Sequence, residues 1–132
     1  MAVLFLVIAG CQHFDRAREC RALADGVNPE LKVLSANFTD NGPISAEELS
    51  SAGRMYTKAA SQLASIHFKE SETASLAAQM KENLTALARS CDRLAMKFKQ
   101  AEPDDSQLRR ELDAQYQRHG AIVSSIERTC RE

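Results

Sequence analysis

Apolar residues recur along this chain at alternating steps of three and four positions, the spacing that places side chains on one face of an α-helix. A β-strand would alternate every two residues, so the pattern predicts helices throughout. The second stripe consists of Leu49, Ala52, Tyr56, Ala59, Leu63 and Ile66; the third of Leu76, Met80, Leu84, Leu87, Cys91, Leu94, Phe98 and Ala101; the fourth of Leu108, Leu112, Gln115 or Tyr116, His119, Ile122 or Val123, Ile126 and Cys130.

Breaks in the pattern separate these stretches. They fall at residues 41–43 (Asn-Gly-Pro), 69–73 and 102–105 (Glu-Pro-Asp-Asp), where turn-forming residues gather. The second helix begins with Ser45 and carries Glu48 three positions later, which predicts a capping box. We expect the fourth helix to start at Asp104 or Asp105.

The first stretch contains Pro29, which would normally end a helix. The stripe nevertheless keeps its rhythm on both sides of the proline, so we expect one helix that is kinked there rather than two separate ones. Its members are Ala17, Cys20, Ala24, Val27, Leu31, Leu34 and Phe38.

Four helices joined by short loops predict an all-α fold, an antiparallel up-down-up-down four-helix bundle. Gly53 and Gly120 fall inside helices, where we expect each to allow two backbones to approach closely. Charged residues of both signs make up 27% of the chain and the net charge is −1, so no electrostatic argument points to nucleic acid.

The N-terminal residues Ile8, Ala9, Gly10 and Cys11 follow an apolar run and resemble the lipobox of a bacterial lipoprotein precursor. The resemblance implies that residues 1–10 are a signal segment, that Cys11 carries lipid after cleavage, and that 11–132 form a single domain. Because Gln12 rather than Asp follows the cysteine, we expect the protein on the periplasmic face of the outer membrane.

One feature departs from this pattern. Secretory signals normally carry a Lys or Arg before the apolar run, and none precedes Ala2 here. We expect the true start to lie upstream of Met1. The alternative interpretation is an apolar tail that packs on the domain; residues 2–10 are too few for a transmembrane helix.

The bundle also constrains the cysteines. In an up-down-up-down bundle the start of the first helix and the end of the fourth lie at the same end, which brings Cys20 close to Cys130. Cys91 lies on the order of 15 Å further along the axis at 1.5 Å per residue, too far for a disulfide with Cys20. We therefore expect a Cys20–Cys130 disulfide, with Cys91 as a buried thiol.

The stretches 20–23 (Cys-Arg-Ala-Leu), 27–29 (Val-Asn-Pro) and 126–130 (Ile-Glu-Arg-Thr-Cys) resemble small helical lipoproteins of myxobacterial type. That resemblance also implies a paired Cys20 and Cys130, and it implies no known catalytic residue.

The motifs of hydrolases, zinc peptidases, di-iron bundles and covalent haem proteins are absent from the sequence, so we expect no enzyme and no cofactor. The expected role is envelope structure or interaction with a protein partner. The alternative is a metal- or small-ligand-binding bundle, in which His13, His67, Cys20 and Cys130 could hold zinc or copper at one end. The disulfide competes for those thiols. We interpret His119 as a core histidine.

Overall fold

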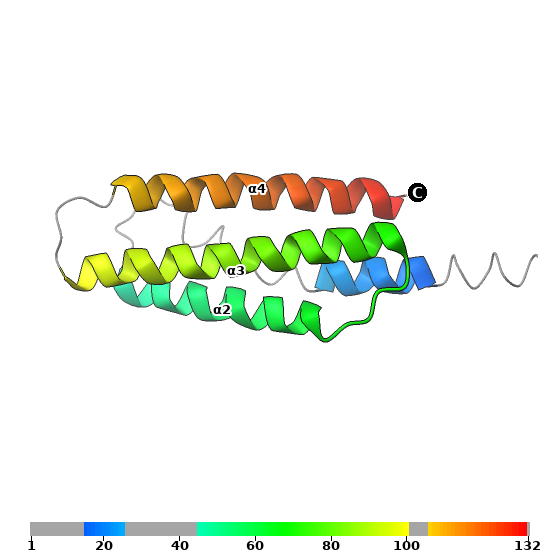
Figure 1. Cartoon of the computed structure of the whole chain (residues 1–132), viewed down its shortest axis with the longest axis horizontal. Coiled ribbons are helices and arrows are strands. Elements are labelled where there is room, and N and C mark those ends of the chain that lie inside the picture. Colours follow the sequence, from blue (N-terminus) through cyan, green and yellow to red (C-terminus); the bar gives the residue numbers. More distant parts are fainter. Residues whose placement is uncertain (1–14, 26–44, 101–105, 132) are drawn as a thin grey trace, which may run out of the picture.

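Helices account for nearly all of the residues that the computed structural model describes, which are 15–25, 45–100 and 106–131 (Figure 1). They form a helical segment over residues 15–25, α2 (Ala46–Ala64), α3 (Ser71–Lys99) and α4 (Ser106–Arg131). This part of the chain contains no strand. The predicted all-α fold of packed helices is therefore confirmed.

The start of α2 is fixed by the predicted capping box. The Ser45 hydroxyl oxygen accepts a hydrogen bond from the Glu48 N–H at 3.1 Å, and the Glu48 carboxylate accepts one from the Ser45 N–H at 3.4 Å. These two bonds satisfy groups that a helix start otherwise leaves without partners. The helix ends at Ala64, although its stripe continues to Ile66, which still packs against the core.

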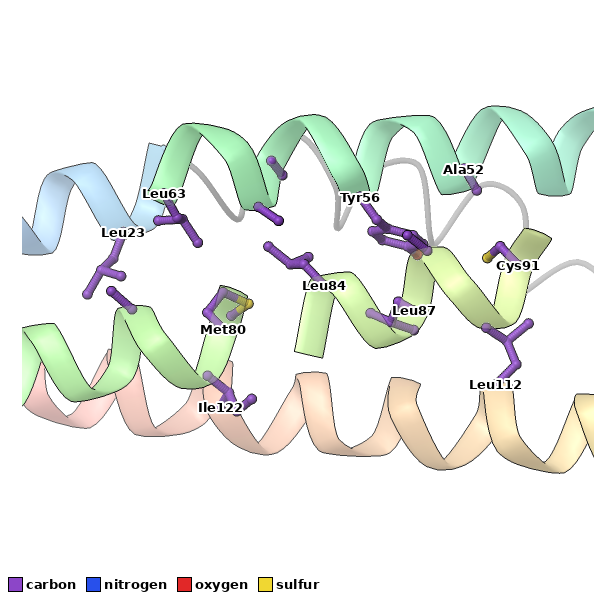
Figure 2. Close-up of a cluster of buried hydrophobic side chains, with 14 of the residues drawn as sticks. Leu23, Ala52, Tyr56, Leu63, Met80, Leu84, Leu87, Cys91, Leu112 and Ile122 are labelled. Atoms are coloured by element: carbon purple, nitrogen blue, oxygen red, sulfur yellow. The ribbon is translucent and has the colours of Figure 1, made fainter. Parts of the chain in front are cut away.

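Helix α3 is the central element, because it lies against α2 on one side and α4 on the other. The large side chains between these helices are almost completely buried, and Figure 2 shows how those that it labels lie between the helices. All the residues predicted for the second and third stripes up to Leu94 are buried except Ile66, which is half-buried. On α4 the buried residues are Leu112, His119, Ile122 and Ile126.

The stripe predicted for the first helix is wrong over its described part. Ala17 is exposed, Cys20 and Ala24 are half-buried, and the buried positions are Glu19 and Leu23. The buried face of the segment is therefore rotated relative to the predicted one. Leu23 is the one large apolar side chain in this segment, and the Glu19 carboxylate accepts hydrogen bonds at the start of α3. The rest of that stripe and the kink at Pro29 lie outside the described residues, as does the expected start of the fourth helix at residue 104 or 105.

The two helical glycines differ in their surroundings. A Cβ atom on Gly53 would lie 2.7 Å from an Asp92 carboxylate oxygen and 3.4 Å from the Ala88 carbonyl oxygen, so α2 and α3 do approach closely there. A Cβ atom on Gly120 would meet no described atom within 4 Å. The expectation of a close approach is therefore correct for Gly53 and wrong for Gly120.

Gly120→Ala should stabilise the protein, by about 0.5–1 kcal/mol, because alanine restricts the unfolded chain and has the higher helix propensity. Gly53→Ala is the matched control, since its added methyl group must displace the Asp92 side chain. We expect the control to gain less or to lose stability. Urea denaturation of both variants measures the difference, and a Gly120→Ala protein less stable than wild type would contradict the prediction.

None of the described helices combines the length and the apolar character needed to cross a membrane.

Candidate functional site

The most distinctive chemistry lies where the segment 15–25 meets the start of α3 and the end of α4. Cys20 and Cys130 are joined there by a disulfide, with a Cα–Cα distance of 5.7 Å and a sequence separation of 110. Both residues are half-buried. The bond connects the first described helical segment to the last turn of α4.

Glu19, next to Cys20, places a buried carboxylate against the N-terminus of α3. Its oxygens accept hydrogen bonds from the Lys69 N–H, from the Glu70 N–H at 3.4 Å and from the Thr73 hydroxyl at 2.8 Å. In the described part of the chain, α3's own N-cap residue Glu70 makes no side-chain capping bond. Glu19 therefore caps α3 from a different segment, where a negative charge also favours the helix dipole.

The electrostatics of Glu19 follow from these contacts. Burial alone would raise the pKa of its carboxyl group, but the hydrogen bonds from Lys69, Thr73 and Glu70, with the charge of Arg18, outweigh burial and hold the pKa below its ordinary value. Because the folded state favours the ionised form, this interaction stabilises the fold above the carboxyl group's unfolded pKa and is lost as the pH falls through the folded value.

Arg16, one turn earlier, bridges two helices. Its guanidinium group donates to the Glu72 carboxylate at 3.1 Å and to the Thr129 carbonyl oxygen at 2.9 Å. A second carboxylate, that of Glu70, lies 3.8 Å from its Nε. Arg16, Glu19 and Cys20 thus attach one short segment to both α3 and α4.

Beside this junction, two shallow grooves of about 460 and 340 Å³ run between the segment 15–25 and residues 62–69. They share Ala22 and Ile66 in their lining. His67 lines the larger groove and is exposed. The seam between this segment and the end of α2 is therefore incompletely filled.

Three of the four residues of the metal-site alternative, Cys20, His67 and Cys130, lie among the described residues. Cys20 and Cys130 are bonded to each other, so neither offers a thiolate to a metal while oxidised. His67 is exposed, and both His13 and the lipidation candidate Cys11 lie outside the described residues. Across 15–25, 45–100 and 106–131, no three His, Cys, Asp or Glu residues gather closely enough to hold a metal ion.

Cys91 is fully buried and is not in a disulfide. Burial, with a smaller effect from the charge of Asp92, raises the pKa of its thiol to about 12. Since the thiolate is the reactive form, Cys91 is chemically inert in the folded protein.

A buried polar pair joins α3 to α4. Asn83 donates from its side-chain nitrogen to the Gln115 carbonyl oxygen at 3.0 Å, and its side-chain oxygen lies 3.0 Å from His119 Nδ1. This arrangement assigns the proton of the neutral imidazole to Nδ1. The other nitrogen, Nε2, is buried and has no hydrogen-bond partner among the described residues.

Burial lowers the pKa of His119, so protonating this ring should destabilise the fold. An unfolded histidine titrates near 6.5 and binds protons that the folded ring resists. Stability is therefore fully present above about pH 6.5 and falls as the pH drops below it, by at most about 1.4 kcal/mol per pH unit for one proton.

His119→Gln should reduce this loss, whereas the exposed control His67→Gln should retain it. Urea denaturation at several pH values between 5 and 8 measures the slopes. Equal slopes in wild type and His119→Gln would show that other groups carry the dependence.

Sequence reasoning did not find Glu19, Arg16 or Asn83 as contact-forming residues. Nothing local marks Glu19, because its partners lie 50 to 54 positions away. The one available signal is its position four residues before Leu23, on the same helical face.

Comparisons with models of protein families, with curated proteins and with solved structures found no match.

Proposed function

We propose that this chain is a bacterial lipoprotein. Lipid on Cys11 anchors a disulfide-closed helical bundle to the periplasmic face of the outer membrane. The role of the bundle is envelope structure or interaction with a protein partner, without catalysis.

The lipobox carries this proposal. Ile8, Ala9 and Gly10 are apolar or small residues directly before Cys11, and polar sequence begins at Gln12. Small residues before a cysteine suit cleavage on its N-terminal side. The described part of the bundle includes residue 15, so the anchor would lie four residues before it in the sequence.

The disulfide supports an exported protein, because such bonds persist in oxidising compartments such as the bacterial periplasm and are rare in the cytosol. The chemistry of the described side chains supports a role other than catalysis. Glu19 is fully engaged as a helix cap, Cys91 is inert, and His119 is enclosed between helices.

Incorporation of labelled fatty acid tests the anchor. The chain, expressed behind an added Lys-Arg segment, should take up labelled palmitate and sediment with membranes. Cys11→Ser should abolish the label, and the control Cys20→Ser should keep it. Equal labelling of wild type and Cys11→Ser would overturn the proposal.

We further propose that the helices follow an antiparallel up-down-up-down order, with the first helix kinked at Pro29. Support comes from the pairs between α3 and α4: Asn83 lies beside His119, whereas Arg93 reaches Glu111 at 3.8 Å. Later residues of α3 thus contact earlier residues of α4, which is the pattern expected for antiparallel helices.

Spin labels test this order. Labels at positions 51 and 107, both exposed, should lie closer together than labels at positions 51 and 128. The reverse result would exclude the proposed order. For the kink, unbroken sequential amide contacts by nuclear magnetic resonance should run across residues 26–38 except at the proline.

A further inference from the structure

We propose that the Cys20–Cys130 disulfide is a reducible latch: a dithiol that reduces it lets the segment 15–25 separate from a bundle whose remaining helices stay packed. The chemical class of the reactant is a dithiol, either a small molecule or a protein with two vicinal thiols.

The segment depends on few contacts for its position. In its described part, residues 15–25, two side chains are buried, those of Glu19 and Leu23. Leu23 is its one fully buried apolar side chain among these residues. The other attachments are polar, through Arg16 and Glu19, and the disulfide is the only covalent one in the described structure.

The larger bundle does not need the segment for most of its core. Apart from Leu23, every fully buried apolar side chain of the described residues belongs to α2, α3 or α4. Figure 2 shows Leu23 at the edge of this cluster, with Leu84 and Leu87 further inside. Loss of the segment would therefore uncover one end of the core and leave its centre in place.

Separation of the segment also leaves few polar groups without a hydrogen-bond partner. Glu72 is exposed, and Lys69, whose N–H binds Glu19, is exposed as well. The Thr73 hydroxyl has a second partner, the Glu70 carbonyl oxygen at 3.2 Å. Water can replace the segment at these positions, so breaking its polar contacts leaves no buried group without a partner.

The disulfide is accessible enough to react. Both cysteines are half-buried, Cys20 on the segment and Cys130 in the last turn of α4, so the bond lies partly at the surface. A thiolate of the dithiol attacks one sulfur and releases the other as a thiolate, which takes a proton. The second thiol then displaces the bound sulfur, so the protein gains two thiols and the reductant becomes a disulfide.

One consequence rests on the proposed lipid anchor. With the latch closed, the disulfide holds against α4 a segment whose first described residue is four positions after Cys11. With the latch open, the bundle is tethered through a longer stretch of chain and can reach further from the membrane. The latch itself requires no lipid.

Hydrogen exchange measured by mass spectrometry tests the latch in full-length Cys11→Ser protein, which carries no lipid and one fewer thiol. On reduction with excess dithiothreitol, peptides covering residues 15–25 should exchange at least tenfold faster. Peptides from the middle of α3, around Leu84 and Leu87, should remain protected and exchange at least tenfold more slowly than the segment. The permanently open variant Cys20→Ser, in the same background, should reproduce the reduced pattern without dithiothreitol.

Two results would overturn the proposal. If the centre of α3 loses its protection to the same extent as the segment, the bond holds the whole bundle rather than one segment. If neither accelerates, the non-covalent contacts hold the segment alone. Glu19→Gln distinguishes the contribution of the disulfide from that of the polar contacts. The substitution weakens the cap on α3, so exchange of the segment should rise in the reduced protein. In the oxidised protein, exchange of the segment should stay within twofold of the parent.

Discussion

Replacing Leu84 with alanine should lower the free energy of unfolding by about 2–5 kcal/mol, the range for truncating a fully buried leucine. Leu84 has no exposed surface and lies on α3, in the middle of the apolar cluster (Figure 2). The substitution removes the transfer free energy of the side chain and leaves a cavity that its neighbours fill only in part. A large effect is expected because α3 packs against α2 on one side and against α4 on the other.

Met96→Ala is the matched control, because Met96 lies on the same helix and is 60% exposed. Its substitution should change stability by less than about 0.5 kcal/mol. Urea denaturation followed by circular dichroism measures both variants. Similar losses of stability at the two positions would show that the buried side chain of Leu84 contributes no more to the free energy of unfolding than the exposed side chain of Met96.

Removing the disulfide should lower the free energy of unfolding by about 2–4 kcal/mol. The bond closes a loop spanning 110 residues, for which the chain-entropy treatment gives about 4.7 kcal/mol. We expect less than that limit, because a released segment 15–25 regains part of its freedom in the folded protein as well.

Single and double variants provide an internal check. Cys20→Ser, Cys130→Ser and the double variant all remove the same bond, so their losses should be nearly equal rather than additive. Thermal and urea denaturation measure the three proteins in parallel. Losses that add would show that the two sulfur atoms contribute separately, without a shared bond.

Hydrophobic spacing predicted most of the fold because burial in α2, α3 and α4 follows the apolar stripes directly. Leu49 and Tyr56 on α2, like Leu76 and Leu94 on α3, are buried where the period places them. The capping box at Ser45 was also predictable, since its two partners lie three residues apart. These features depend on neighbours in sequence.

The segment 15–25 was harder to predict because distant partners decide its buried face. A glutamate ordinarily faces solvent, and Glu19 is buried only because free N–H groups at the start of α3 lie opposite it. Similarly, Asn83 is buried beside the third stripe because α4 supplies the Gln115 carbonyl and His119. Such pairings depend on how helices are placed, which the spacing of apolar residues alone does not specify.

Because Cys91 is inert only in the folded protein, the order of core collapse and thiol oxidation decides which disulfide forms. The thiols of Cys20 and Cys130 are 110 residues apart, so they meet only after the intervening helices have been synthesised. Cys91 is nearer to Cys130 along the chain and would compete for it in an unfolded polypeptide. Once α3 has packed between its neighbours, that competitor is enclosed and protonated. Collapse of the core before oxidation therefore selects the correct bond, and oxidation before collapse would yield scrambled isomers.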